Sequence, residues 1–584
     1  MATLDSFHIM IVSKYFATIK DFINLEMVCK KYNGNTKKFH FNPIPLTHKT
    51  NMLFPNIETL HLWSEKDENF GNEILANTQN NTKGKIVAEK NYYEIVVWFS
   101  VDYETVDKNN GKNIKFKNVT YTSNNINKYG NTIPTCVRSL DDCCYYDCNS
   151  INNVNIPSNV KSIGYDCFCK CSNLSHIIIP PSVTLIGDFC FGRCYNLDSI
   201  DIPSSISKLS DRCFFECSSL SRVNIAPSVT SIGYNCFSGC SSLIEVEIPS
   251  SVTSIDVSCF YQCVNLSKLV IPSTVVRIYN YCFFRCYNLS SLVIPSSVTV
   301  IDNYCFSECV KLRDVKMSSN LLSLGNYCFS GCSNLSVIEI PQSVTSVGQY
   351  CFDNCSNLRN VAVPSSVTSI GIYCFNQCIA LSSVILKANV KLLGDNCFCE
   401  CRSLSNLDIP SSLESLGIYC FNRCSSLNDL IIPSNVTLIG DFCFAGCNNI
   451  TSVCISSSVI IIGNYCFSGC KYINDVDIPS SVKSIGDYAF SGCNNLKIVE
   501  IPSSVTSIGK NCFPPQTKWC VLNMHNKSTV MQSNTNNMDL PKAIKHTIID
   551  NFSSLNLFVN KSTLSGSVLQ LKHVKCDINL LNKK

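Results

Sequence analysis

Cysteine is the residue type in this sequence that offers the most chemistry. The chain has 40 cysteines among 584 residues, and most of them form pairs with three residues between the two members. Cys167/Cys171 and Cys190/Cys194 are two of roughly fifteen such pairs. A thiolate can attack an electrophile, bind a soft metal ion or oxidise to a disulfide, so each role has to be weighed.

Three states of these cysteines are open. A disulfide needs Cβ atoms about 3.5–4.5 Å apart, whereas residues four apart on one turn of chain lie nearer about 5–6 Å. Zinc could take four thiolates from two successive pairs, but a regular series of pairs gives no reason to stop at four. The third state is a reduced, buried thiol that packs as a small hydrophobe. We favour it, because Ala489 replaces the first cysteine of one pair without disturbing the spacing.

Catalysis would require partners that the sequence does not supply. A cysteine nucleophile needs a nearby base, and His176 is the single histidine within the region that carries the pairs. Gly84-Lys85 and Gly509-Lys510 lack the upstream Gly and the following Ser or Thr of a phosphate-binding loop. We therefore predict a non-catalytic protein without a cofactor or a metal site.

The cysteine pairs sit in a strict internal repeat. A phenylalanine recurs about every 23 residues, and Tyr145 holds the same place one step before the first of them. The series runs through Phe168, Phe191, Phe214, Phe237, Phe260, Phe283, Phe306, Phe329, Phe352, Phe375, Phe398, Phe421, Phe444, Phe467, Phe490 and Phe513. About seventeen units without insertions predict a stacked array, because one unit alone buries too little apolar surface to fold.

One repeat unit can be read for its elements from residue 243 to residue 265. Its L-x-x-V-x-I run over 243–248 predicts a short strand that Pro249 ends, and Val252 and Ile255 form a second apolar step. The Cys-Phe-x-x-Cys segment predicts a helical or turn-like piece. Many units have Gly after the second step, such as Gly233, Gly371 and Gly463, which we interpret as a positive-φ position; Tyr279 there predicts a distorted turn.

The repeat resembles the leucine-rich repeats of the BspA-like family, whose pattern runs close to I-P-S-S-V-T-S-I-G-x-x-A-F-x-G-C-x-x-L. Residues 340–355 and 501–513 follow it almost letter for letter, with Cys in place of the usual Ala before Phe. The resemblance covers roughly two-thirds of the chain. It implies an α/β repeat solenoid, a leucine-rich repeat array with a helical N-terminal cap, and a scaffold that binds other proteins.

One outward-facing position of each strand varies while its neighbours repeat. It lies just before the last Ile of the strand, so its side chain points away from the core. The column has many acids, one Lys and apolar residues near 270–293, which favours a protein partner with basic segments over a nucleic acid. The alternative is that solvent-facing positions without a constraint simply vary. Candidate partner-binding residues are Asp201, Glu247, Val270, Val293, Glu339, Asp408, Asp477 and Glu500.

A second column contains tyrosines two residues before the repeated Phe. Its candidates for partner contacts are Tyr304, Tyr327 and Tyr350. Rigid aromatic side chains serve as anchors in interfaces, but an evenly repeated residue is more often packing. We therefore expect these rings mainly to cover the rim of the array.

The sequence divides into four parts. Residues 1–45 are predicted as a helical segment, with Asp21 as the cap of a second helix; residues 46–132 form a divergent repeat-like region; residues 133–516 form the solenoid; residues 517–584 form a C-terminal cap and tail. The stretch LEMVCKKY at 25–32 resembles the end of an F-box, although the Leu-Pro of an F-box start is absent. That resemblance implies a substrate receptor that docks a cullin-ligase adaptor through residues 1–45, the alternative being a simple cap.

Composition narrows the compartment and the class of partner. The formal net charge is +4 and charged residues make up 15%, which is unlike a disordered chain or a dedicated nucleic-acid binder. No run approaches the roughly 18 apolar residues of a membrane span. We expect a cytoplasmic protein; export to the cell surface by an unconventional route, with an adhesion role, is the alternative.

Overall fold

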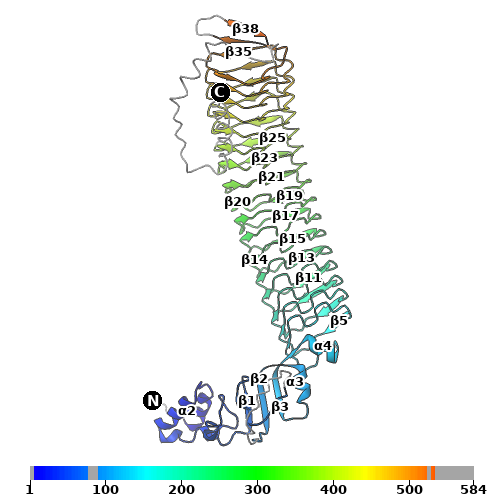
Figure 1. Cartoon of the computed structure of the whole chain (residues 1–584), viewed down its shortest axis with the longest axis vertical. Coiled ribbons are helices and arrows are strands. Elements are labelled where there is room, and N and C mark those ends of the chain that lie inside the picture. Colours follow the sequence, from blue (N-terminus) through cyan, green and yellow to red (C-terminus); the bar gives the residue numbers. More distant parts are fainter. Residues whose placement is uncertain (1–4, 76–89, 388, 523–527, 533–584) are drawn as a thin grey trace, which may run out of the picture.

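The computed structural model describes residues 5–75, 90–387, 389–522 and 528–532. The molecule is a curved rod with a smaller lobe set at its N-terminal end (Figure 1). Four α-helices, all before residue 130, are described: α1 (Ser6–Ser13), α2 (Ile19–Val28), α3 (Tyr103–Lys108) and α4 (Ser123–Tyr129). None of the described helices has both the length and the hydropathy to cross a membrane.

The lobe is built from α1, α2, three 3-10 turns and two strands of a parallel sheet. The 3-10 turns are η1 (Lys30–Tyr32), η2 (Thr36–Lys38) and η3 (Asn51–Leu53). Phe22, Phe39 and Phe54 meet edge to face in its core, with ring centroids 5.3–5.9 Å apart. The prediction that Asp21 caps α2 is wrong, because Thr18 is the N-cap. Asp21 lies in the first turn, where its carboxylate accepts a hydrogen bond from the Thr18 N–H (2.9 Å).

Parallel strands lead from the lobe into the rod. β1 (Thr59–Leu62) pairs with β2 (Glu94–Asp102), and β2 pairs with β3 (Ile114–Tyr121). β3 then pairs with β4 (Ser139–Leu140), so the lobe and the first coils share one six-stranded sheet in the order β1-β2-β3-β4-β6-β8. The helices α3 and α4 follow β2 and β3 where later coils have only turns.

Each winding of the rod, called a coil here, carries two short strands. The first series, the odd strands, are β5 (Asn153–Asn155), β7 (His176–Ile178), β9 (Ser199–Ile202), β11 (Arg222–Ile225), β13 (Glu245–Glu247), β15 (Lys268–Val270), β17 (Ser291–Val293), β19 (Asp314–Lys316), β21 (Val337–Glu339), β23 (Asn360–Val363), β25 (Ser383–Leu386), β27 (Asn406–Asp408), β29 (Leu430–Ile431), β31 (Ser452–Cys454), β33 (Asp475–Asp477) and β35 (Ile498–Pro502). They form the strand face.

The second series, the even strands, starts with β4. The others are β6 (Ser162–Ile163), β8 (Leu185–Ile186), β10 (Lys208–Leu209), β12 (Ser231–Ile232), β14 (Ser254–Ile255), β16 (Arg277–Ile278), β18 (Val300–Ile301), β20 (Ser323–Leu324), β22 (Ser346–Val347), β24 (Ser369–Ile370), β26 (Leu392–Leu393), β28 (Ser415–Leu416), β30 (Leu438–Ile439), β32 (Ile461–Ile462), β34 (Ser484–Ile485) and β36 (Ser507–Ile508). β10 to β36 form one 14-stranded parallel sheet. At the far end β37 (Lys518–Leu522) pairs in parallel with β35 and antiparallel with β38 (Ser528–Gln532).

The repeated apolar residues form a single core along the rod. Leu243, Val252, Ile255 and Phe260 of one coil are fully buried. Each repeated Phe stacks on the next, as Phe260 does on Phe283 with centroids 5.4 Å apart and planes 4° apart. The core runs without a break from Val119 to Trp519. The predicted solenoid of stacked repeats is therefore confirmed, although the described coils after residue 130 contain turns and no helix.

The turns around the repeated Phe are joined between coils as regularly as the strands. Tyr304 N–H donates to the Asn326 carbonyl (2.9 Å), Phe306 N–H to Cys328 (2.9 Å) and Glu308 N–H to Ser330 (2.6 Å) of the next coil. This pattern requires positive φ at the residues two before and two after Phe, for example 59° at Tyr304 and 59° at Glu308. The positive φ thus falls on non-glycine residues in most coils.

The prediction of positive φ at Gly233, Gly371 and Gly463 is wrong. These glycines are required because the backbone of the preceding coil approaches them closely: a Cβ on Gly371 would lie 2.6 Å from the Gln349 nitrogen. Tyr279 occupies the same place in its coil and also lacks a positive φ. A turn distorted by a positive φ at Tyr279, as predicted, is therefore not found. Neighbouring coils have Asp256 and Asp302 there, so a Cβ is accommodated along that stretch.

Candidate interaction surface

The varied column of the strand face is exposed along the whole rod. Its members recur at the same place in stacked coils, and within each short sheet the parallel register sets them opposite one another: Glu247 pairs with Val270, and Val293 with Lys316. All eight predicted strand-face residues are exposed: Asp201, Glu247, Val270, Val293, Glu339, Asp408, Asp477 and Glu500. The structure therefore brings them into one line, although they are spread over 300 residues of sequence.

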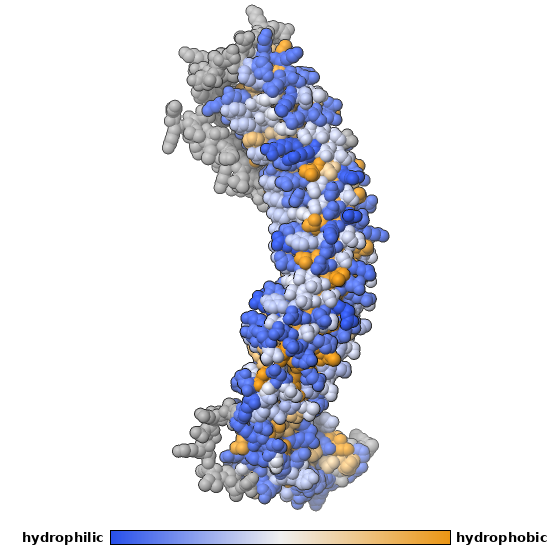
Figure 2. Space-filling model, turned by 90° about the vertical axis from the view of Figure 1, so that its right-hand side faces the viewer, coloured by the Kyte–Doolittle hydropathy of each residue, from blue (hydrophilic) through white to orange (hydrophobic). Residues whose placement is uncertain are grey.

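Two apolar side chains of the predicted set lie in successive coils of this line. Three isoleucines at the same place in other coils are exposed as well: Ile178, Ile385 and Ile431. Val270 is 66% exposed and Val293 is 60% exposed, and they occupy the same place in successive coils. Apolar side chains occur as separate spots along the rod in Figure 2, with hydrophilic ones between them. Acidic side chains in the column lie on both sides of the valine pair, with Asp201 and Glu247 before it and Glu339 and Asp408 after it.

A shallow hollow of about 790 Å³ interrupts the strand face at β19, β21 and β23. Charged side chains of both signs border it: Asp314, Lys316, Glu339 and Lys387. Lys387 stands where most units have the proline that follows the strand. Val315 and Met317, at places that are buried in most coils, are partly exposed here. Of the predicted residues, only Glu339 lines this hollow.

The predicted tyrosine column forms a ladder of stacked rings. Tyr304, Tyr327 and Tyr350 lie face to face, with centroids 4.5 and 4.4 Å apart and planes 6° apart. Burial raises the pKa of all three hydroxyls. Because each ring uses its faces on its neighbours, a partner could reach only the edges and hydroxyls. This geometry favours rim cover over anchoring.

The cysteines occupy two buried columns with different environments. The second cysteine of each pair donates its thiol hydrogen to the carbonyl of the repeated aromatic residue one coil earlier. Cys194 Sγ lies 3.1 Å from the Phe168 oxygen, Cys217 Sγ lies 3.0 Å from that of Phe191, and Cys424 Sγ lies 3.1 Å from that of Phe398. This bond explains why the second position is Cys in every unit from 171 to 493. The spacing of the cysteines in the sequence does not indicate it.

Burial also controls the acidity of these thiols. It raises the pKa of Cys217 and of Cys309 to about 12. A thiol with such a pKa stays protonated near neutrality and is a poor nucleophile and a poor metal ligand. Cys29, Cys136, Cys143 and Cys454 are exposed exceptions. The predicted burial of the pairs is thus confirmed.

Other groups with catalytic or metal-binding potential stay apart. His176 lies exposed on β7, outside the buried thiol columns. Within the described ranges, no three His, Cys, Asp or Glu side chains are placed to hold a metal ion.

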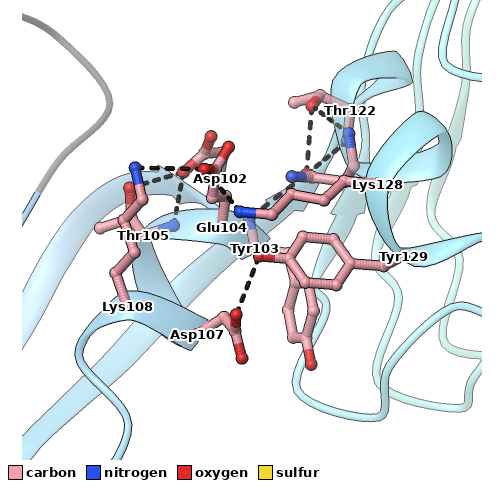
Figure 3. A network of polar contacts seen from close by, with 10 residues as sticks. Asp102, Tyr103, Glu104, Thr105, Asp107, Lys108, Thr122, Lys128 and Tyr129 are labelled. Atoms are coloured by element: carbon pink, nitrogen blue, oxygen red, sulfur yellow. Dashed lines mark hydrogen bonds and ion pairs between the residues drawn. The ribbon is translucent and has the colours of Figure 1, made fainter.

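A polar network joins the lobe to the rod (Figure 3). Glu104 on α3 contacts both Lys128 on α4 (2.8 Å) and Lys108 (3.1 Å). Tyr129 donates its hydroxyl hydrogen to Asp107 (2.9 Å). Desolvation and this bond raise the pKa of Tyr129. The network joins α3 to α4 at the place where the two parts meet.

Comparison with known proteins agrees with this architecture. Six copies of the BspA type leucine rich repeat region match the chain, within residues 114–244, 253–378, 345–460 and 437–564. A leucine-rich repeat protein from Bacteroides ovatus is 28% identical over 66% of this chain and 88% of its own, with a TM-score of 0.49. A leucine rich cell surface protein from Faecalibacterium prausnitzii is 27% identical over 49% of this chain and 82% of its own, with a TM-score of 0.32.

No curated protein matches the chain. The F-box resemblance of residues 1–45 stays a prediction. The matched ranges cover more than half of the 584 residues, and they include the stacked coils described above. The chain therefore belongs to the BspA-type leucine-rich repeat family.

Proposed function

We propose that this protein is a non-catalytic scaffold that binds another protein through the varied column of its strand face. The observation that carries the proposal is the exposed pair Val270 and Val293, whose side chains are 66% and 60% accessible. Both occupy the position of the unit that varies between coils, whereas the apolar positions around it repeat strictly. Every inward position serves the stack, so only such outward columns are free to vary with a partner.

The partner should combine an apolar contact with basic segments. Val270 and Val293 would be covered at the centre of the interface, where apolar burial contributes most. Asp201 and Glu247 on one side and Glu339 and Asp408 on the other would meet Lys or Arg side chains of the partner. Asp477 and Glu500 extend the acidic column towards the C-terminal end.

A paired capture experiment tests this role. The double variant Val270→Asp/Val293→Asp should lose partner proteins that wild type captures from its native source, as measured by quantitative mass spectrometry. Val276→Asp is the matched control, because Val276 is 53% exposed but precedes the even strand β16. The same captured set with all three proteins would contradict the proposal.

Ionic strength gives a second readout. Binding of a partner identified in this way should weaken as salt rises, since charges at the edge of an interface are screened. Neutralising Glu247 and Asp408 should reduce that salt dependence. An affinity independent of salt would contradict the basic-partner component.

An F-box receptor is the second candidate function. It is favoured by α1, whose side chains are apolar on the outer face as well as the inner: Ile9 is buried, whereas Phe7 is 62% exposed. On α2, Met27 is 79% exposed. A helix that is apolar all round is normally covered, here by a cullin-ligase adaptor. Purified adaptor should bind wild type and fail to bind Phe7→Glu/Met27→Glu, while Lys20→Glu serves as control; no binding to wild type would contradict this candidate.

A further inference from the structure

The first odd strand lacks a partner on one side. β5 (Asn153–Asn155) pairs with β7, and within the described ranges no strand pairs with its other edge. In several later coils this edge is bonded to the coil before, as in β19: the Ile294 N–H donates to the carbonyl of Lys316 (2.8 Å). Five other odd strands, β9, β13, β17, β29 and β35, also have no paired strand on that side within the described ranges. The odd strand of the preceding coil still contacts β9, β13, β17 and β35 there. Lys316 holds the same place in its coil as Asn155 holds in the first. An unpaired strand edge offers a row of donors and acceptors to another chain.

The backbone groups on the open edge can be assigned. The Asn152 carbonyl accepts the Ser175 N–H (3.0 Å), so it points towards β7. Successive residues of an extended strand direct their backbone groups to opposite sides. The Asn153 carbonyl and both backbone groups of Asn155 therefore face the open edge.

The preceding stretch of chain lies across a hollow from this edge and does not pair with it. Residues 131–133 align with Val154–Ile156 in the repeat and could have paired with β5. However, the Asn131 carbonyl accepts the hydroxyl hydrogen of Tyr145 (3.0 Å), and the Gly130 carbonyl accepts that of Tyr121 (2.7 Å). Tyr145 is the one residue of the aromatic column with a hydroxyl, so this arrangement occurs only at the first coil.

A hollow lies where the missing pairing would have been. Its volume is about 510 Å³. Its lining carries no charged side chain; the residues are Asn131, Thr132, Ile133, Ser150, Ile151, Asn152, Asn153, Val154 and Asn155. Asn131 and Ser150 approach across it, with Nδ2 and Oγ 3.5 Å apart.

We propose that the open edge of β5 binds an extended, uncharged peptide segment of a partner protein, which adds to the strand face as a further parallel strand. Main-chain hydrogen bonds from Asn153 and Asn155 would hold it, and the carboxamide and hydroxyl groups of the hollow would accept uncharged polar side chains. The site is separate from the valine pair, so it goes beyond the proposed scaffold function and does not depend on it.

A peptide copying the strand itself is the natural probe, because each odd strand is paired by a strand of its own kind. The capped peptide Asn-Asn-Val-Asn-Ile-Pro, labelled with a fluorophore, should bind the full chain with saturable anisotropy at concentrations up to about 1 mM. Methylation of its Val and Ile nitrogens, which would face β5, should abolish binding. Methylation of its Asn nitrogens, which would face away, should leave binding unchanged.

A protein variant tests the same bond from the other side. Asn155→Pro and Asn155→Ala both remove the carboxamide, but only the Pro variant also removes the outward N–H. Asn155→Pro should therefore bind the peptide at least tenfold more weakly than Asn155→Ala does. Proline is tolerated on an edge strand when its nitrogen faces outward, and an unchanged thermal midpoint would verify folding. Should Asn155→Pro fail to fold, the binding of the two methylated peptides to the wild-type chain still tests the proposal.

The outcomes separate this site from the scaffold function. Val270→Asp/Val293→Asp should bind the peptide normally. No saturable binding to wild type, equal binding of both methylated peptides, or equal binding of the Pro and Ala variants would each overturn the proposal without bearing on the valine pair.

Discussion

At the scale of single residues, the two cysteines of each pair have different tasks. The first mainly fills space, since Ala489 replaces it in one coil and remains fully buried. Cys144 and Cys305 are exceptions, because their thiols donate to the carbonyls of Tyr121 (3.0 Å) and Tyr279 (2.9 Å). The second also satisfies a carbonyl of the preceding coil through its thiol hydrogen, as Cys424 does for Phe398. A cysteine can serve in such a place because it is small and apolar yet carries a weak donor.

This difference predicts unequal effects of the same substitution. Cys424→Ala removes the thiol donor, so it should destabilise the protein by about 1 kcal/mol more than Cys420→Ala, which removes a sulfur of the first column. Chemical denaturation of both variants in the presence of a reducing agent measures the difference. Equal loss of stability would mean that the S–H bond contributes nothing.

The buried thiols also predict a dependence of stability on pH. Burial raises the pKa of Cys217, Cys309, Cys493 and Cys512 from 9.0 to about 12. The folded state therefore keeps protons that the unfolded state loses between pH 9 and pH 12. Each such thiol should reduce the free energy of unfolding by about 1.4 kcal/mol per pH unit in that window and have little effect below it.

Thermal unfolding in a reducing buffer at pH 7, 8, 9 and 10 checks this expectation. The midpoint should fall steeply only above pH 9. Replacing Cys217 with Ala should make that fall shallower, because one titrating thiol is gone. A midpoint that is flat up to pH 10 would contradict the burial of these groups.

At the scale of elements, the glycine after the second apolar step controls how closely the coils approach. A Cβ on Gly371 would meet the Gln349 backbone at 2.6 Å, and both neighbouring coils also have glycine there, Gly348 and Gly394. Gly371→Ala should therefore lower the thermal midpoint by several degrees. Gly111→Ala is a control for positive φ without crowding, since its φ is 85° and nothing lies within 4 Å of the added Cβ. A larger loss at Gly111 would contradict this explanation.

Elements with strictly repeated residues could be predicted from the sequence. The period, the L-x-x-V-x-I strands and the buried Phe and Cys columns all follow from apolar residues at fixed spacing. The residues with positive φ could not be predicted from the sequence, because a tyrosine such as Tyr304 has no intrinsic preference for that conformation. The hydrogen bonds between the turns of successive coils impose it. The role of the glycine after the second apolar step was predicted wrongly, because a positive φ and a close backbone approach both select glycine. The sequence alone does not distinguish these two causes.

The candidate sites were predictable to different degrees. The exposed column followed from the alternation of side chains along a strand, but the hollow at Glu339 depends on the local spacing of coils, which no pattern records. The open edge of β5 had one signal in the sequence, the hydroxyl of Tyr145 in a column of phenylalanines. Its meaning depended on the position of the Asn131 carbonyl, which is set by tertiary contacts.

At the scale of the whole molecule, two hydrophobic cores meet at one joint. One core fills the lobe from Phe22 to Val101 and the other runs along the rod, and Val106 and Phe116 pack against both. The polar network of Glu104, Asp107, Lys128 and Tyr129 lies at the same joint. The shared sheet from β1 to β8, this apolar packing and the polar network therefore all join the lobe to the rod, which matters if each part binds a partner.

Removing the two carboxylates should loosen this joint without unfolding either core. In Glu104→Gln/Asp107→Asn the side chains keep their size, but Glu104 no longer attracts Lys128 and Lys108, and the bond from Tyr129 loses its charged acceptor. The distance distribution between spin labels at Asn56 in the lobe and Ser254 on the rod should broaden, with an unchanged thermal midpoint of the rod. Glu245→Gln, which removes the remote ion pair with Lys268, should leave the distribution as in wild type. An equally narrow distribution in the double variant would show that the shared sheet and the packing of Val106 and Phe116 hold the lobe against the rod without the polar network.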